Sequence, residues 1–307
     1  MRRCLAVGLA VLGAAAGAQA LDVPFPTAAA RMVVVAPHPD DESLGAGGLL
    51  ARLDAAGVPA AVVTLTYGDG WPWAAQVLVG RPPTDADYVA MGRIRQRELL
   101  AALGVLGLEP RALSLLGFPD GALDVLWTTG WSGAPTASPT TGARTVPYAD
   151  AVDPHALYTG DALVAVLARV FAALRPTVLV LPHPADVHPD HAATPRFVAA
   201  ALGRLRGRGV LPPKVRLLTY LVHHAVWPPS AADVGEALPP PTRAEVPATR
   251  WTSVALTPAE AAAKRRAIEA HATQIAASPD FLRKFERTTE PFGRVKARVW
   301  VDARYAH

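Results

Sequence analysis

Short, nearly continuous apolar runs alternate with longer helical patterns along most of this chain. The run Met32–Ala36 is apolar at every position, as expected for a strand buried on both faces of a sheet, and a helical segment follows it. This alternation predicts parallel strands joined by crossover helices, so we expect a Rossmann-like three-layer α/β/α domain with a mainly parallel sheet. Strands are predicted at 32–36, 58–66, 113–116, 177–181, 215–222 and 295–301, and helices at 43–56, 89–106, 161–174, 191–205 and 258–276.

The N-terminus has the pattern of a targeting signal. Arg2 and Arg3 precede an apolar run over residues 5–18, and the Ala-Gln-Ala of residues 18–20 suits a cleavage site. The alternative is a membrane anchor, but a run of about 15 residues falls short of the roughly 20 that span a bilayer. We therefore expect a signal peptide over residues 1–20, a secreted, periplasmic or cell-envelope location, and no stable membrane insertion after cleavage.

The remainder of the chain, residues 21–307, is predicted to form a single domain. Hydrophobic residues make up 51% and charged residues 18% of the sequence, which is typical of a globular protein with a large core. Two stretches near 117–159 and 223–250 are rich in Pro, Gly, Thr or Ser and are interpreted as long inserted loops. The net charge of +4 comes from basic residues that are mostly scattered singly, which argues against a nucleic-acid partner.

Cys4 is the only cysteine of the chain, and cleavage of the signal peptide would remove it. The mature protein would then have neither a disulfide nor a thiolate that could bind a metal ion. Any metal ion would therefore have to be bound by His, Asp or Glu side chains.

Charged side chains directly follow the first predicted strand, in the segment His38-Pro39-Asp40-Asp41-Glu42. In an open α/β sheet, ligands bind beyond the carboxyl ends of the strands. Carboxylates and an imidazole are costly to bury there without a partner, and a divalent cation would compensate them. The alternative is a helix N-cap, because acidic residues favour the positive end of a helix. A cap explains one or two acidic residues, but it does not explain the histidine or the prolines that flank it.

A second polar cluster follows the predicted strand at 177–181. Of the nine histidines in the chain, three lie within residues 181–191, namely His183, His188 and His191. The alternative interpretation is a solvated loop that carries ordinary histidines. If the two strands are neighbours in one parallel sheet, both clusters open onto the same crevice.

Together these segments resemble the PIG-L/LmbE-like family of zinc-dependent N-acetylglucosamine deacetylases, which includes the GlcNAc-phosphatidylinositol, mycothiol and bacillithiol deacetylases. The family signature is Ala-His-Pro-Asp-Asp-Glu followed later by His-Pro-Asp-His. Here residues 37–42 read Pro-His-Pro-Asp-Asp-Glu and residues 188–191 read His-Pro-Asp-His. The resemblance extends in the same order from about Met32 to Gln274. Further matches lie at 95–98, 103–104, 117–121, Lys264, His271 and Gln274.

The resemblance implies a catalytic role for each matching residue of the two motifs. His38, Asp41 and His191 would bind the metal ion, which is Zn²⁺ in the family, although another divalent ion such as Fe²⁺ suits the same ligands. Asp40 would act as the general base. His188 would stabilise the oxyanion or act as the general acid.

Other matches concern the substrate and the surroundings of the metal ion. Arg95 and Asp120 match family positions that hold the sugar. Asp190 and Glu42 are expected either to orient the ligand imidazoles or to cap the following helices. Several family members have a Tyr two places before the first His of the second motif. Here that place is taken by Asp186, which puts the contribution of this Tyr in doubt.

We therefore expect an exported, metal-dependent N-deacetylase that acts on an N-acetylglucosamine-type amino sugar or glycoside by means of metal-activated water. Its partner would be a small saccharide or glycoconjugate. Two alternatives stay open: a metal-dependent hydrolase of another N-acyl amide, and a non-catalytic saccharide-binding module that stacks sugars on loop tryptophans. These tryptophans, which suit lid packing equally well, are Trp71, Trp73, Trp127 and Trp131.

Four of the six remaining histidines are candidates for the site but have no assigned role, namely His183, His223, His224 and His271. His183 is expected to be a structural loop residue, since one His-x-x-His already accounts for the motif. His223 and His224 follow the predicted strand at 215–222, which makes them candidates for lining the same crevice. His271 either contacts the site or satisfies a hydrogen bond in the core.

Overall fold

The computed structural model describes residues 30–295, with the exception of 211–213, 225–226, 230–234 and 244. The predicted signal peptide over 1–20 therefore lies outside the described residues. Within the part of the chain that is described, no helix combines the length and the hydrophobicity needed to cross a bilayer.

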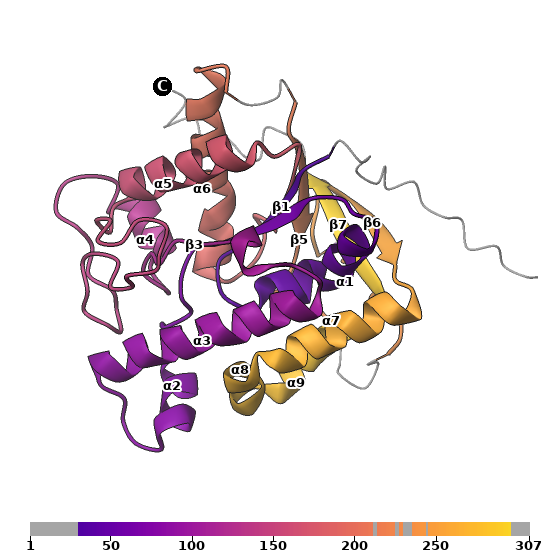
Figure 1. The fold of residues 1–307 in the computed structure, drawn as a ribbon, viewed down its shortest axis with the longest axis horizontal. Helices are drawn as coiled ribbons and strands as arrows, with labels where there is room; N and C mark the ends of the chain where they lie inside the picture. Colours follow the sequence, from indigo (N-terminus) through magenta and orange to yellow (C-terminus); the bar gives the residue numbers. More distant parts are fainter. Residues whose placement is uncertain (1–29, 211–213, 225–226, 230–234, 244, 296–307) are drawn as a thin grey trace, which may run out of the picture.

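The described strands form one sheet (Figure 1), in which the first five strands of the chain pair in parallel and the last two add antiparallel pairings. They are β1 (Met32–Ala36), β2 (Ala60–Thr64), β3 (Leu113–Leu115), β4 (Val178–Pro182), β5 (Arg216–Tyr220), β6 (Thr249–Ala255) and β7 (Thr289–Val295). Their order across the sheet is β3-β2-β1-β4-β5-β7-β6, so that β7 and β6 extend it beyond β5.

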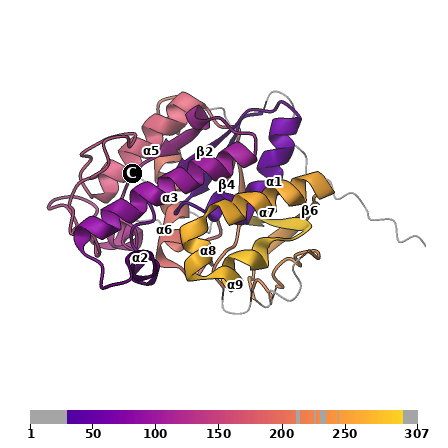
Figure 2. The ribbon, with the colours of Figure 1, turned by 60° about the horizontal axis from the view of Figure 1, so that its bottom comes forward.

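Helices cover both faces of the sheet and complete three layers (Figures 1 and 2). One face carries α1 (Asp41–Ala55), α3 (Asp85–Val105) and α7 (Pro258–Ala270), and the other carries α5 (Gly160–Leu174) and α6 (Pro189–Arg206). The prediction of a Rossmann-like three-layer domain with a mainly parallel sheet is thus confirmed. Shorter helices are α2 (Pro72–Val79), α4 (Leu123–Thr128), α8 (Ala272–Ala277) and α9 (Pro279–Leu282).

Local sequence explains where the central elements lie. Every residue of β1 and of β4 is buried, in agreement with the continuous apolar runs that predicted them. The side chains of Thr84 and Thr257 accept hydrogen bonds from the first turns of α3 and α7. In turn, the side chains of Asp87 and Glu260 accept the backbone N–H groups of Thr84 and Thr257. Both helices therefore begin with a capping box.

The chain reverses its direction across the sheet between β1 and β4. From β1 it passes through α1 to β2 on one side, and from β4 it passes through α6 to β5 on the other. At such a switch point the loops that follow two adjacent parallel strands diverge and leave a crevice, where open α/β sheets bind their ligands. Both polar segments identified in the sequence begin at this crevice.

The C-terminal part departs from the predicted pattern. The helix predicted at 258–276 is broken at His271 into α7 and α8, and β6 and β7 were not predicted. Of the strand predicted at 295–301, Val295 ends β7 and the rest lies outside the described residues. β7 contains Pro291 and Gly293, residue types that are unfavourable within strands, so the sequence did not predict a strand here.

The two stretches interpreted as long loops contain some regular structure. Residues 117–159 include α4 and an antiparallel bridge between Thr145 and Leu157. The stretch 223–250 leads into β6 at its end.

Candidate metal centre and active site

Two turns at the switch point bring together the side chains predicted to bind a metal ion. His38 lies in the turn after β1, Asp41 is the first residue of α1, and His191 lies in the first turn of α6. Nδ1 of His38 is 3.2 Å from Oδ2 of Asp41 and 3.3 Å from Nε2 of His191. The same nitrogen of His191 is 3.2 Å from Oδ2 of Asp41. All of these side chains are buried.

The spacing of these donor atoms fits a tetrahedral zinc ion. With bonds of about 2.0–2.1 Å, neighbouring ligand atoms of such an ion lie about 3.3–3.4 Å apart. The observed separations of 3.2, 3.2 and 3.3 Å are close to this value. His38, His188 and Asp190 form a second group of closely spaced donors. However, both carboxylate oxygens of Asp190 accept backbone hydrogen bonds, whereas in the described contacts Asp41 accepts one, from His38, so we favour the first group.

Carboxylates orient each candidate ligand imidazole through its other nitrogen. Nδ1 of His191 is 3.1 Å from Oδ2 of Asp186. Nε2 of His38 is 3.1 Å from Oδ1 of Asp120 and 3.2 Å from Oδ2 of Asp190. Such outer carboxylates fix the tautomer and the ring orientation of metal-binding histidines. The cluster therefore has the surroundings that a metal site requires, in addition to the ligands.

The carboxylates also favour a positive charge at the centre of this cluster. Burial by itself would lower the pKa of His191, but Asp186 and Asp41 outweigh it and raise this pKa to about 10. Burial would raise the pKa of Asp41, yet the neighbouring His191 holds it well below its ordinary range. Carboxylates that stabilise a buried proton in this way also provide the negative charge needed to bind a cation.

Asp40, the predicted base, lies beside the cluster in an unusual backbone conformation. Its φ of 136° falls in a region that residues with a side chain seldom adopt. Nη2 of Arg95 is 3.1 Å from Oδ2 of Asp40 and also donates to the carbonyl of Pro39. Burial raises the pKa of Asp40 to about 6, although Arg95 acts in the opposite direction. A carboxylate with this pKa is suited to act as a general base near neutral pH.

Arg95 and Asp120, the residues expected to hold the sugar, both line the crevice but are engaged with the protein. Nη1 of Arg95 donates to the carbonyl of Gly68 at 2.8 Å. Oδ2 of Asp120 accepts the backbone N–H of Gly70 at 2.6 Å. Through the contacts described above, these side chains position the candidate base and a candidate ligand. A contact of either side chain with a sugar stays a prediction.

Two further imidazoles, those of His188 and His223, line the crevice next to the cluster. The ring of His188 packs edge-on against His38 at a centroid distance of 4.8 Å, and the ring of His223 lies 4.7 Å from that of His191. Burial and neighbouring histidines lower the pKa of His188 to about 4 and that of His223 to about 3, so both rings are neutral at pH 7. Nδ1 of His188 accepts the backbone N–H of Asp190 at 3.3 Å, which leaves the proton of the neutral ring on Nε2.

The crevice encloses about 380 Å³, a volume typical of small-molecule sites. Part of its lining is the polar cluster. Another part comes from the start of α2 and from α8 and α9, and it includes the apolar side chains of Trp71, Phe281 and Leu282. A cavity with both polar and aromatic walls suits a sugar, which has polar edges and less polar ring faces.

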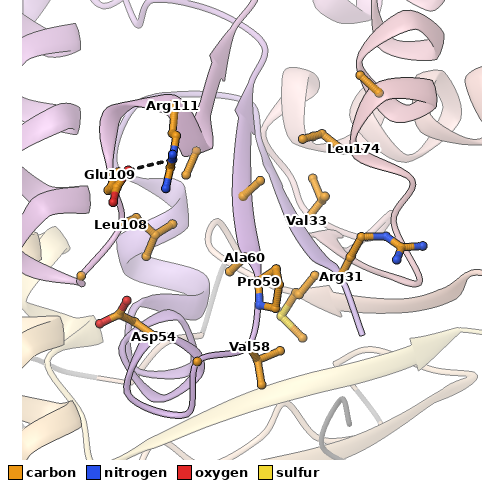
Figure 3. Close-up of a pocket in the computed structure, with 16 residues that line it drawn as sticks. Arg31, Val33, Asp54, Val58, Pro59, Ala60, Leu108, Glu109, Arg111 and Leu174 are labelled. Atoms are coloured by element: carbon orange, nitrogen blue, oxygen red, sulfur yellow. Dashed lines mark ion pairs between the residues drawn. The ribbon is translucent and has the colours of Figure 1, made fainter. Parts of the chain in front are cut away.

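A larger hollow of about 550 Å³ lies at the opposite, amino-terminal edge of the sheet (Figure 3). It is lined by the starts of β1 and β2 and contains the exposed ion pair of Glu109 and Arg111, whose atoms are 2.7 Å apart. Its described lining includes no histidine. Because ligands bind at the carboxyl edge of such sheets, we assign the site to the crevice beside His38.

Two of the other unassigned histidines, His183 and His271, have structural contacts. Nε2 of His183 is 2.8 Å from Oγ1 of Thr249, and its ring stacks on Trp251, which agrees with a structural role. His271 contacts Glu42 at 3.2 Å. Among the hydrogen bonds of the described residues, none joins Glu42, His271 or His224 to the imidazole of His38 or His191.

The four tryptophans expected in loops lie in different settings, and the expectation was wrong for Trp73, which is in α2 and exposed, and for Trp127, which is in α4. Trp71 lines the cavity, whereas Trp127 packs edge-on against Trp131 and Phe197 at 5.3 and 5.1 Å between ring centroids. The indole N–H of Trp73 donates to the carbonyl of Ala277. Stacking on a sugar is therefore a hypothesis for Trp71, while packing describes Trp127 and Trp131.

A doubly wound α/β sheet with imidazoles and carboxylates gathered at its switch point is the arrangement of an α/β enzyme. Residues 33–202 match the family model described as PIG-L: GlcNAc-PI de-N-acetylase, and the chain belongs to this family. The family predicted from the sequence motifs is thereby confirmed.

Curated relatives extend the match over most of the chain. The 1D-myo-inositol 2-acetamido-2-deoxy-alpha-D-glucopyranoside deacetylase of Nocardia farcinica (strain IFM 10152) is 33% identical over 276 residues, which cover 82% of this chain and 83% of the relative. The protein of the same name from Rhodococcus jostii (strain RHA1) is 33% identical over 272 residues, covering 81% and 83%. Because these relatives are named deacetylases, the prediction that the chain is an amide-hydrolysing enzyme is confirmed.

Solved structures share the fold. A conserved protein from Thermus thermophilus superposes with a TM-score of 0.50 at 25% identity and covers 87% of this chain and 94% of its own. The N,N'-diacetylchitobiose deacetylase of Pyrococcus horikoshii superposes with a TM-score of 0.50 over 85% and 82% of the two chains. At 18% identity, this second likeness shows the fold alone.

Proposed function

We propose that this chain is an exported, metal-dependent N-deacetylase that acts on an N-acetylglucosamine-type amino sugar or its glycoside. One observation carries the proposal. Donor atoms of His38, Asp41 and His191 converge at 3.2–3.3 Å, while both imidazoles are held by carboxylates on their other nitrogens. The names of the curated relatives, which are deacetylases of an acetamido sugar joined to inositol, support the substrate class.

His38, Asp41 and His191 are the residues that would hold the metal ion, for which we propose Zn²⁺. A bound zinc ion would polarise the amide carbonyl and lower the pKa of a water molecule. The same ligands suit Fe²⁺, so the ion in the cell has to be measured directly.

Asp40 is the group that would take the proton from the attacking water. Its carboxylate lies one residue from Asp41, and its pKa of about 6 leaves it mostly ionised at pH 7. Once protonated, Asp40 can return the proton to the leaving nitrogen. The contact with Arg95 keeps this carboxylate in place while its charge changes.

His188 would donate a hydrogen bond to the oxygen that becomes negative during the reaction. Because its Nδ1 accepts a backbone N–H and its ring is neutral, Nε2–H is a donor. A fixed donor of this kind stabilises an oxyanion. The lowered pKa favours this role over that of a general acid.

The proposal is tested by measuring acetate release from N-acetylglucosamine and its glycosides by residues 21–307. Protein stripped of metal, protein restored with zinc and a His38→Ala variant are compared. His155→Asn is the control, because His155 is exposed, does not line the cavity and has a positive φ that Asn tolerates. Release that requires zinc and His38 but not His155 supports the proposal. No release from any acetamido sugar, despite stoichiometric zinc, refutes the substrate class.

The apolar part of the cavity favours one second candidate, the hydrolysis of a larger N-acyl group. Phe281, Leu282 and Leu44 would contact an acyl chain that acetate does not provide. A series of N-acyl glucosamines separates the candidates. If kcat/KM rises with each added methylene, the longer acyl group is the substrate, and if it falls, the acetyl group is.

Export rests on the sequence of residues 1–20, with its basic start, apolar run and Ala-Gln-Ala end. N-terminal sequencing of protein from the envelope or the medium tests it. A mature chain that begins at Leu21 is expected, and full-length protein confined to the cytoplasm would contradict export.

A further inference from the structure

Asp40 holds a backbone conformation that needs external support. Its φ and ψ are 136° and −31°. Among the described residues, the other non-glycine positions with positive φ are His155, Arg175 and Ala248, which are exposed, whereas Asp40 is buried. Non-glycine residues persist in such regions when the surrounding structure over-determines them, and such cases cluster at active sites.

Glu42 supplies a contact to the part of Asp40 that this conformation constrains. Its Oε2 accepts the backbone N–H of Asp40 at 3.0 Å. Arg95, by contrast, contacts the Asp40 carboxylate and the Pro39 carbonyl. In the described structure, Glu42 is therefore the acceptor that fixes the orientation of the Asp40 N–H. Arg95 holds the neighbouring Pro39 carbonyl and Asp40 carboxylate.

Glu42 is itself held by a residue from the far end of the chain. Its Oε1 accepts the hydroxyl of Ser43 at 2.6 Å and lies 3.2 Å from Nε2 of His271. Both Glu42 and His271 have no exposed surface. A buried carboxylate needs partners, and His271 together with Ser43 fixes the position of Oε1 of Glu42.

His271 in turn belongs to the element that forms the apolar wall of the cavity. It stands at the break between α7 and α8, and its carbonyl accepts the backbone N–H groups of Gln274 and Ile275. Gln274 and Phe281 line the cavity. A continuous set of contacts thus runs from the cavity wall through His271 and Glu42 to the backbone of Asp40.

We propose that Glu42 and His271 form a brace that holds Asp40 in its strained conformation and aligns it with the α8–α9 wall. Both are positioning residues, since neither contacts a candidate metal ligand through its side chain in the hydrogen bonds described. The inference rests on the proposed role of Asp40 as the base. It gives a role to two residues of the sequence motifs, Glu42 and His271, that the reaction itself does not use.

The kinetic test compares Glu42→Ala, Glu42→Gln and His271→Ala in the zinc-loaded full chain. Misplacement of a catalytic group by about 1 Å costs about 100-fold in rate, so Glu42→Ala is expected to lose about that much kcat, with KM within twofold and zinc still stoichiometric. Glu42→Gln retains a carbonyl for the Asp40 N–H and is expected to recover most of the loss. Unchanged kcat per zinc-loaded molecule in Glu42→Ala would overturn the brace. If that variant does not fold, unchanged kcat in His271→Ala would do the same.

Glu98→Gln is the matched control. Glu98 also ties α8 to another helix, because its carboxylate accepts the N–H and hydroxyl of Thr273 at 2.8 and 2.7 Å, but it does not touch Asp40. We expect its kcat to stay within twofold of that of the native protein. A loss equal to that of Glu42→Ala would mean that any weakening of α8 slows the enzyme, and the specific brace would be refuted.

A crystallographic readout separates the brace from the proposed function. In a structure of Glu42→Ala, the φ of Asp40 is expected to leave the positive region, whereas Glu42→Gln keeps it. A φ that stays near 136° in Glu42→Ala refutes the brace whatever the activity. If the native protein hydrolyses no amide but this φ relaxes in Glu42→Ala, the proposed function fails and the brace stands.

Discussion

Replacement of Asp186 by Asn tests whether carboxylates around the cluster tune a metal site. Oδ2 of Asp186 accepts hydrogen bonds from the backbone of Val222 and His223 at 3.1 and 3.0 Å and lies 3.1 Å from Nδ1 of His191. Oδ1 accepts the backbone N–H of His188 at 3.0 Å. An asparagine has one oxygen, so its NH₂ group must face at least one N–H donor in either orientation.

The size of the effect follows from these contacts. With the amide oxygen in the place of Oδ2, the variant loses the hydrogen bond to the backbone N–H of His188 and the negative charge beside His191. A hydrogen bond to a charged group contributes about 1.5–3 kcal/mol, and about 1.4 kcal/mol is a tenfold change in affinity. We therefore expect the Kd for zinc to rise about 30-fold, within the range seen when outer carboxylates of metal ligands are removed.

Competition with a chromophoric chelator at about pH 7.5 measures this Kd. Asp153→Asn is the control, because Asp153 forms an exposed surface pair with Arg169 at 2.8 Å and should leave the Kd unchanged. Circular dichroism checks that each variant is folded. A folded Asp186→Asn protein with a Kd within threefold of the native value would refute the assignment of His191 as an oriented ligand.

Three further predictions concern the base, a buried acid and a buried ion pair. Asp40→Asn should retain stoichiometric zinc but lose about 10²–10⁴-fold of the hydrolysis rate, measured as acetate release. Burial, with a contribution from Asp120, raises the pKa of Asp69 from its ordinary 3.8 to about 7. The folded state therefore keeps a proton that the unfolded chain has released, so stability should fall as the pH rises from about 4 to 7, and Asp69→Asn should remove that part of the slope in urea titrations. Lys264→Met should cost about 3–5 kcal/mol of unfolding free energy, because it leaves the buried Glu290, 2.8 Å away, without its cation.

Each of these has an outcome that contradicts it. Hydrolysis by Asp40→Asn at the native rate would exclude Asp40 as the base. An equal pH slope in native and Asp69→Asn protein would mean that Asp69 is ionised in the folded state. A cost below about 1 kcal/mol for Lys264→Met would show that Glu290 is satisfied by the backbone N–H groups of Gly48 and Leu49 alone.

The central sheet and the residues of the candidate metal cluster could be predicted because most of their signals are local. The apolar runs of β1 and β4 identify buried strands by composition, and each is followed directly by the polar residues of one cluster. The rule that ligands bind beyond the carboxyl ends of parallel strands then brings His38 and His191 together. That β1 and β4 are neighbours in the sheet was a condition of this argument, and the structure supplied it.

What could not be predicted depends on contacts between distant parts of the sequence. Glu290 lies within a strand and is buried, because it pairs with Lys264 and accepts the N–H groups of Gly48 and Leu49. A charged residue in a strand suggests exposure, so Glu290 is a further reason, besides Pro291 and Gly293, why β7 was not predicted. The proposed role of Glu42 likewise depends on its contact with His271, which lies 229 residues away in the sequence.

The position of β7 also matters while the chain is being synthesised. β5 is complete at Tyr220, but the strand that covers its outer edge begins at Thr289, about 70 residues later. At about 5–20 residues per second, the nascent chain holds an uncovered β edge for several seconds, and such edges recruit other strands. A chain truncated before Thr289 keeps both sequence motifs of the candidate site but leaves this edge open. We therefore expect truncation to produce aggregates, detectable by light scattering, rather than a weakly active enzyme.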